Sequence, residues 1–112
     1  MPTRLPQLHV ADTEEALGEL AAGLQRGRPA VVLALTGSNG KTSVKSLLAG
    51  ILARAGSAYV NPGNFNNQIG LPLAVIAAPE DARFAVYEMG AGRPGDIAWL
   101  CSIVTPQVAL VN

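Results

Sequence analysis

The hydrophobic and polar positions of the chain follow two patterns that alternate along the sequence. Short and uniformly apolar runs occur at residues 30–35, 84–87 and 108–111, and runs of this kind are typical of strands that are buried on both faces. Between these runs, apolar residues recur every three or four positions, which is the spacing of one helix face. Strands that alternate with helices predict an α/β fold, with a parallel sheet and helices on both of its faces, in three layers.

Caps, glycines and prolines set the expected ends of each element. Asp12 can cap the first helix, with Glu15 at the third position of a capping box. Pro72 is tolerated in the third helix only because it falls in the first turn. The apolar stripe of the second helix includes Leu47 and Ile51. In order, the expected elements are a helix from Asp12 to Gly23 or Gly27, a strand at 30–35, a helix from Val44 to a C-cap at Gly56, a strand at 57–60, a helix at 69–77, a strand at 84–87, a helix at 97–104 and a strand at 108–111.

The length of the chain limits its domain organisation. It has 112 residues, which is enough for one domain, because single domains most often contain about 100–150 residues. Residues 1–11 carry two prolines and no sustained periodicity. We therefore expect residues 1–11 to form a tail or linker and residues 12–112 to form the folded unit.

Composition and charge exclude several classes of protein. Eight basic and eight acidic side chains give a formal net charge of zero, so neither nucleic acid nor an anionic membrane is expected as a partner held by bulk charge. A hydrophobic content of 49% argues against disorder, and no apolar run reaches the roughly 18 residues of a membrane helix. Cys101 and His9 are the single residues of their types, which leaves no Cys/His metal cluster. Without a secretory signal at its start, the chain is expected to be cytoplasmic.

The most informative motif lies between the strand at 30–35 and the helix that follows it. Glycines there allow successive N–H groups to point inward, and the helix N-terminus and a lysine add positive charge, as a phosphate-binding loop requires. The common form of that loop has a further glycine where Leu35 stands, so this loop is shorter or differently shaped. A glycine-asparagine turn with an incidental lysine is the alternative. The expected nucleotide-binding residues are Thr36, Gly37, Ser38, Asn39, Gly40, Lys41, Thr42 and Ser43, of which Thr42 can also ligate Mg²⁺.

A carboxylate follows the strand at 84–87. Glu88 stands at the carboxyl end of this strand, where open α/β sheets bind their ligands. It can hold Mg²⁺ directly or through water, a role that aspartate more often has in phosphate-loop proteins. The alternative is an exposed acid that forms a salt bridge with Arg93. The neighbouring phosphate loop favours the metal.

Amide side chains gather in the segment at 61–68. They offer hydrogen-bond donors and acceptors without charge, as the site of a polar substrate beside a nucleotide requires. The preference of asparagine for turns explains the same residues without any ligand. The amide residues are Asn61, Asn64, Asn66, Asn67 and Gln68.

Three motifs, in this order, resemble the Mur ligase family of ATP-dependent enzymes. The first is the loop at 36–43, the second is Gly-Asn-Phe-Asn-Asn at 63–67 with Ile-Gly-Leu-Pro at 69–72, and the third is Glu-Met-Gly-Ala at 88–91. The resemblance runs from about Val10 to Asn112. It implies that residues 12–112 are the N-terminal part of the ATP-binding central domain, which has a P-loop NTPase-like fold that is incomplete here.

The resemblance also implies an activity and roles for single residues. Lys41 would contact the outer phosphates of ATP as a catalytic residue, Thr42 and catalytic Glu88 would serve two Mg²⁺ positions, and the loop with Asn64, Asn66 and Asn67 would meet a muramoyl-peptide substrate. The motifs are most similar to those of family members that make peptidoglycan precursors in the bacterial cytoplasm. These members add D-Ala-D-Ala to UDP-MurNAc-tripeptide through an acyl phosphate.

Other parts of the family pattern are not found in the sequence. The resemblance implies partner domains, an N-terminal one for the UDP group and a C-terminal one that closes over ATP. The chain is therefore expected to be a fragment that binds Mg-ATP at most. The alternatives are a non-catalytic nucleotide-binding module, a small kinase and an enzyme similar to folylpolyglutamate synthetase, although that last family usually has glycine where Thr42 stands.

Overall fold

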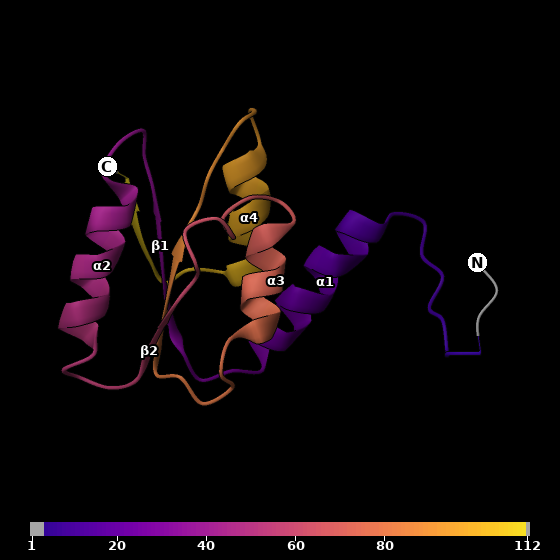
Figure 1. The fold of residues 1–112 in the computed structure, drawn as a ribbon, viewed down its shortest axis with the longest axis horizontal. Coiled ribbons are helices and arrows are strands. Elements are labelled where there is room, and N and C mark those ends of the chain that lie inside the picture. Colours follow the sequence, from indigo (N-terminus) through magenta and orange to yellow (C-terminus); the bar gives the residue numbers. More distant parts are fainter. Residues whose placement is uncertain (1–3, 112) are drawn as a thin grey trace.

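The structure is a computed structural model that describes residues 4–111; residues 1–3 of the expected tail and Asn112 lie outside the described part. Helices and strands alternate after a first helix, in the order that the sequence predicts (Figure 1). The elements are α1 (Thr13–Arg26), β1 (Val31–Thr36), α2 (Lys41–Leu52), β2 (Ala58–Val60), α3 (Gly70–Ala77), β3 (Phe84–Glu88), α4 (Asp96–Val104) and β4 (Val108–Val111).

The four strands form one parallel sheet in the order β2-β3-β1-β4. In the central pair, Val31 lies beside Phe84 and Leu35 beside Glu88. Because all strands run in the same direction, their carboxyl ends lie at one edge of the sheet. The loop after β1 and the residues after β3 therefore reach the same edge.

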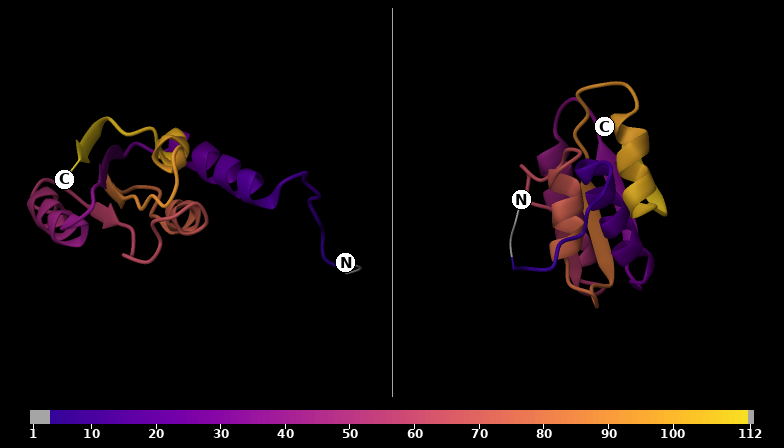
Figure 2. Two further views of the ribbon diagram at one scale, coloured as in Figure 1. Left: turned by 90° about the horizontal axis from the view of Figure 1, so that it is seen from above. Right: turned by 90° about the vertical axis from the view of Figure 1, so that its right-hand side faces the viewer.

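Helices cover both faces of this sheet, which confirms the predicted three layers (Figure 2). α2 lies on one face and contacts the three strands β1, β2 and β3, while α1, α3 and α4 pack against one another on the other face. Ala85 and Tyr87 of β3, with Met89 just after the strand, belong to the core beneath α1, α3 and α4. Successive side chains of a strand point to opposite faces, so Glu88 faces α2.

Tyr87 ties the sheet to α1 at the centre of the core. Its ring is fully buried, its hydroxyl group donates to Oε1 of Gln25 at 3.4 Å, and its ring meets that of Tyr59 edge to face. Burial, with Tyr59 adding to the effect and Arg28 opposing it, raises the pKa of Tyr87 above its ordinary value. The phenol therefore stays protonated, and keeps its hydrogen bond, to a higher pH than an exposed tyrosine.

Most element ends agree with the prediction, but those of α2 do not. Asp12 caps α1 as expected, since its Oδ1 accepts from the N–H of Glu15 at 3.0 Å. α2 begins at Lys41, before the predicted start at Val44. It ends at Leu52, so the predicted C-cap at Gly56 is wrong. Beyond Leu52, the amides of Arg54 and Ala55 bond three residues back, as in tight turns, while the amide of Gly56 bonds four residues back, to the carbonyl of Leu52 at 3.1 Å.

The outer flank of α2 is open to solvent. Lys45 is the buried residue of this helix, whereas Leu47 and Ile51 of its apolar stripe are 68% and 65% exposed. Residues 4–11 contain no helix or strand and run away from the sheet (Figure 1). Among the described residues, no helix has the length and apolar character needed to cross a membrane.

Candidate functional site

The segment from Gly37 to Gly40 joins β1 to α2 at the carboxyl edge of the sheet. Gly40 precedes the helix with φ of 75°, a left-handed conformation that glycine adopts without steric cost. No side chain caps α2 and its first turn has no acidic residue, so the amides of that turn remain available to an anion. The structure thus brings the predicted loop, Lys41 and a helix N-terminus together as a phosphate site requires.

Glu88 lies directly beside this loop. The amide of Met89 donates to the carbonyl of Leu35 at 2.9 Å, and the hydroxyl of Thr36 donates to the carbonyl of Met89 at 3.0 Å. The end of β3 is therefore tied to the start of the loop. The alternative of an exposed Glu88 paired with Arg93 is wrong, because Glu88 is only 3% exposed and Arg93 pairs with Asp96.

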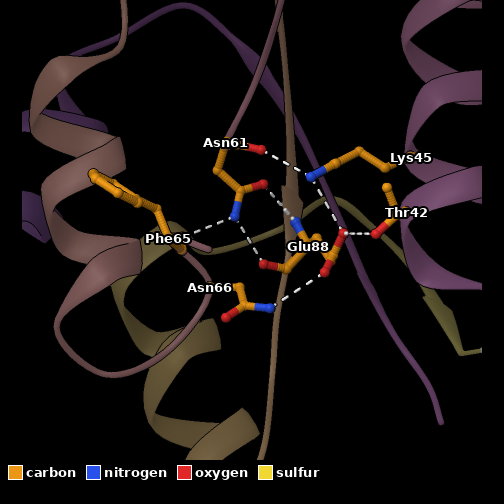
Figure 3. A network of polar contacts seen from close by, with 6 residues as sticks. All are labelled: Thr42, Lys45, Asn61, Phe65, Asn66 and Glu88. Carbon is orange, nitrogen blue, oxygen red and sulfur yellow. Dashed lines mark hydrogen bonds and ion pairs between the residues drawn. The ribbon is translucent and has the colours of Figure 1, made fainter. Parts of the chain in front are cut away.

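The carboxylate of Glu88 is held by three side chains (Figure 3). Its Oε1 lies 3.2 Å from Nζ of Lys45 and accepts from the hydroxyl of Thr42 at 3.4 Å. Its Oε2 accepts from Nδ2 of Asn66 at 3.2 Å. These partners come from α2 and from the loop after β2, so two elements of the chain converge on one carboxylate.

Asn61 fixes the backbone of Glu88. Its side chain is completely buried; Oδ1 accepts from the N–H of Glu88 at 2.8 Å, and Nδ2 donates to the carbonyl of Glu88 at 2.9 Å and to that of Phe65 at 3.0 Å. The carbonyl of Asn61 accepts from Nζ of Lys45 at 2.9 Å. Asn61 thus joins β3, α2 and the asparagine-rich loop (Figure 3).

The other predicted substrate residues lie in different surroundings. Asn66 reaches Glu88, as described above, whereas Asn64 is exposed to solvent. Oδ1 of Asn67 accepts from the amides of Ile69 and Gly70 at 3.1 and 2.7 Å, so this side chain supports the start of α3. The structure therefore brings one of the three asparagines to the carboxylate.

Sequence reasoning missed Lys45. The residue follows Lys41 by four positions and Thr42 by three, so helical spacing places all three on neighbouring parts of one face of α2. That spacing was the signal in the sequence from which Lys45 could have been found. A charged residue within an apolar stripe is ordinarily interpreted as solvated, which is why the burial of Lys45 became visible only in the fold.

The oxygen atoms at this site suit Mg²⁺. Thr42 and Glu88 offer a hydroxyl and a carboxylate, which are the hard ligands that Mg²⁺ prefers. Their oxygens lie 3.4 Å apart, and neighbouring ligands of an octahedral Mg²⁺ are about 3 Å apart, given bonds of about 2.1 Å. No group of three or more acidic, histidine or cysteine residues that could hold a metal occurs among residues 4–111. Such a site needs phosphate and water oxygens to complete it, as Mg-nucleotide sites do.

Sequence comparison finds relatives of this chain among known proteins. The family model described as "Mur ligase middle domain" matches residues 35–112. The UDP-N-acetylmuramoyl-tripeptide–D-alanyl-D-alanine ligase of Escherichia coli K12 is 49% identical over 108 residues, which is 96% of this chain and 24% of that protein. The enzymes of the same name from Haemophilus influenzae and Bacillus subtilis are 44% and 40% identical, over 96% and 92% of this chain and 24% and 22% of their own lengths.

Solved structures agree with the sequence relatives. A crystal structure of MurF from Acinetobacter baumannii superimposes with a TM-score of 0.91 at 38% identity and covers 99% of this chain and 25% of its own. MurF ligase from Thermotoga maritima in complex with ADP gives 0.90 at 35% identity, over 99% of this chain and 26% of its own. The chain spans about a quarter of the length of these relatives. With the family model over most of its length and the same fold in relatives of substantial identity, this chain belongs to the Mur ligase family and represents part of the middle domain.

Proposed function

We propose that this chain is the phosphate-binding part of an ATP-dependent ligase that adds D-Ala-D-Ala to UDP-MurNAc-tripeptide, in the synthesis of peptidoglycan precursors in the bacterial cytoplasm. The observation that carries the proposal is the meeting of the phosphate loop and Glu88 at one sheet edge, with Thr42 and Glu88 3.4 Å apart. The names of the relatives support the choice of substrates. Their greater length supports further domains, which would bind the UDP group and close over ATP.

The proposed reaction has two transfers. The terminal phosphoryl group of ATP passes to a carboxylate oxygen of the tripeptide, which gives an acyl phosphate and ADP. The amine of D-Ala-D-Ala then attacks the carbonyl carbon, phosphate leaves, and the amine loses a proton as the amide forms. Charge neutralisation and alignment are the main contributions of a protein to such steps.

The residues that the sequence predicted for the site have separate tasks in this scheme. The loop amides and Lys41 hold the outer phosphates and stabilise the charge that develops during transfer. Thr42 and Glu88 would hold Mg²⁺, which would supply charge neutralisation at the phosphates. The loop that contains Asn64, Asn66 and Asn67 contacts the muramoyl peptide, and Asn66 links that contact to Glu88.

Replacing Lys41 tests the proposal. In the intact enzyme that carries this sequence, Lys41→Ala removes the cation at the phosphates, and we expect ADP release to fall at least about a hundredfold, as when one transition-state donor is lost. The assay counts only ADP release that requires both UDP-MurNAc-tripeptide and D-Ala-D-Ala. Arg54→Ala is the control, because Arg54 is an exposed cation beyond the far end of α2. Near-normal turnover of Lys41→Ala would reject the assigned role.

A nucleotide-binding module without turnover is the second candidate for the chain on its own, because the chain spans only a quarter of the length of its relatives. Titration of the intact protein that carries this sequence with Mg-ATP, followed by calorimetry and by ADP detection with and without both substrates, separates the two functions. Binding without ADP release supports the module. ADP release that depends on both substrates supports the complete ligase.

A further inference from the structure

Lys45 is a buried cation to which the proposed function gives no task. It is 6% exposed, and lysine is almost never buried to this extent unless it is paired. Its Nζ lies 3.2 Å from Oε1 of Glu88 and 2.9 Å from the carbonyl oxygen of Asn61 (Figure 3). The ammonium group of Lys45 thus contacts the carboxylate of Glu88 and the carbonyl of Asn61, while Lys41 is the lysine of the proposed phosphate loop.

The charges at this position explain why a cation is needed. Glu88 is buried beside polar groups that are formally neutral, Thr42, Asn61 and Asn66, and Lys45 is its ion-pair partner. A buried carboxylate without a positive charge is strongly unfavourable. Lys45 therefore supplies the charge that Glu88 requires when no other cation is present.

The same carboxylate oxygen faces two groups. Oε1 of Glu88 meets both Nζ of Lys45 and the hydroxyl of Thr42, and Thr42 with Glu88 forms the proposed Mg²⁺ position. We infer that Lys45 is a positioning residue, the resident counter-ion that holds the Glu88 carboxylate toward Thr42 and shares it with the divalent cation. This inference rests on the proposed function, because it takes the Mg²⁺ position from it.

The inference has a measurable consequence for the folded state. Without Lys45, the buried carboxylate has no positive partner, so the folded state is destabilised until another cation arrives. A ligand that binds only the folded state raises its stability. Mg²⁺ alone should therefore stabilise a protein that lacks the lysine charge more than it stabilises the wild type.

The experiment uses the intact enzyme and follows the melting temperature against Mg²⁺ concentration, without nucleotide and at constant ionic strength. Lys45→Met keeps the length of the side chain and removes the charge, Lys45→Arg keeps a charge, and a double variant combines Lys45→Met with Glu88→Gln. We expect Lys45→Met to melt below the wild type without Mg²⁺ and to rise further with it. Because Lys45→Met removes a charge that repels Mg²⁺, half of its rise in melting temperature should occur at a Mg²⁺ concentration at least about threefold lower than for the wild type.

The control variants separate charge from shape. Lys45→Arg should respond to Mg²⁺ like the wild type. The double variant should melt above Lys45→Met without Mg²⁺ and show no Mg²⁺ response, because the charge that needs a partner is gone. If Lys45→Met cannot be purified, Glu88→Gln is compared with the double variant in its place. Glu88→Gln leaves Lys45 buried without a negative partner, so it should melt below the double variant.

Two results would overturn the inference. One is a Mg²⁺ response of Lys45→Met that is equal to or smaller than that of the wild type. The other is a double variant that is no more stable than the single variant with which it is compared. Failure of the proposed function has another signature: ADP would bind the wild type equally well with and without Mg²⁺, and Lys41→Ala would turn over normally. That pair of results would remove the inference together with the function.

Discussion

At the scale of single residues, three asparagines of one loop do three different things. Asn61 is buried and pairs with the backbone of Glu88, Asn66 donates to the carboxylate of Glu88, and Asn67 accepts from amides at the start of α3. The same amide group pairs with a backbone at Asn61, donates to a carboxylate at Asn66 and accepts from two amides at the start of α3 at Asn67, because each position offers it different partners. Residue type alone therefore does not assign a role in this loop.

Asn67 gives a prediction at this scale. Asn67→Ala removes the oxygen that accepts from Ile69 and Gly70, and we expect the free energy of unfolding to fall by about 1 kcal/mol, as for the loss of a helix cap. Asn67→Asp keeps an acceptor oxygen and should retain most of the stability. Chemical denaturation of the two variants measures the difference. Equal stability of Asn67→Ala and the wild type would show that the cap contributes nothing.

At the scale of elements, α1 and α4 meet through a glycine. A Cβ atom added at Gly18 would lie 2.7 Å from Cζ2 of Trp99 and 3.4 Å from Cδ1 of Ile103. Gly18 is buried, and Trp99, which is half-buried, packs against the core. The absence of a side chain at Gly18 allows the tryptophan ring to lie against α1, so this one position sets how closely the two helices approach.

Substitutions in α1 test this contact. Gly18→Ala improves helix propensity but forces the ring of Trp99 to move, and we expect a net loss of about 1–2 kcal/mol because overpacking outweighs propensity. Gly23→Ala is the matched control in the same helix, since its Cβ would meet nothing closer than 3.8 Å. It should gain about 0.5–1 kcal/mol. Thermal melting distinguishes the two signs, and a gain at both positions would contradict the packing argument.

At the scale of the whole molecule, the two edges of the sheet differ. β2, at one edge, has three residues. β4, at the other, is exposed along its length, with Val108 51% and Val111 80% exposed. An apolar strand with unpaired backbone groups is a template for another strand, so this edge is the part of the molecule that most needs a partner.

We expect the 112-residue chain, produced on its own, to self-associate through β4. Leu110→Lys places a charge on this strand, where the native side chain is 43% exposed, and should shift the chain toward monomer, because edge lysines oppose strand pairing. Sedimentation velocity measures the change. Leu47→Lys, on the exposed flank of α2, is the control and should leave the association in place. The opposite result would assign the association to α2.

The sequence by itself determined the features that depend on neighbouring residues. Local spacing and composition predict the strands at the centre of the sheet, the Asp12 cap, the glycine-containing loop before α2 and the position of Glu88 at a strand end. The parallel sheet follows too, because strands that alternate with helices have few other ways to bury their apolar faces. The predicted end of α2 was wrong, because the turns after Leu52 carry no strong signal in the sequence.

The tertiary structure alone decided which of these residues meet. Asn61 reaches Glu88 across 27 residues of chain, and Lys45 reaches the carbonyl of Asn61 across 16. The pairing of strands and the side of the sheet on which α2 lies bring them together, and no local pattern encodes that encounter. The sequence pattern around Lys45 is that of a solvated side chain, but the fold buries it beside Glu88. Lys45 is the counter-ion of Glu88, because a charge removed from water requires an opposite charge at hydrogen-bonding distance.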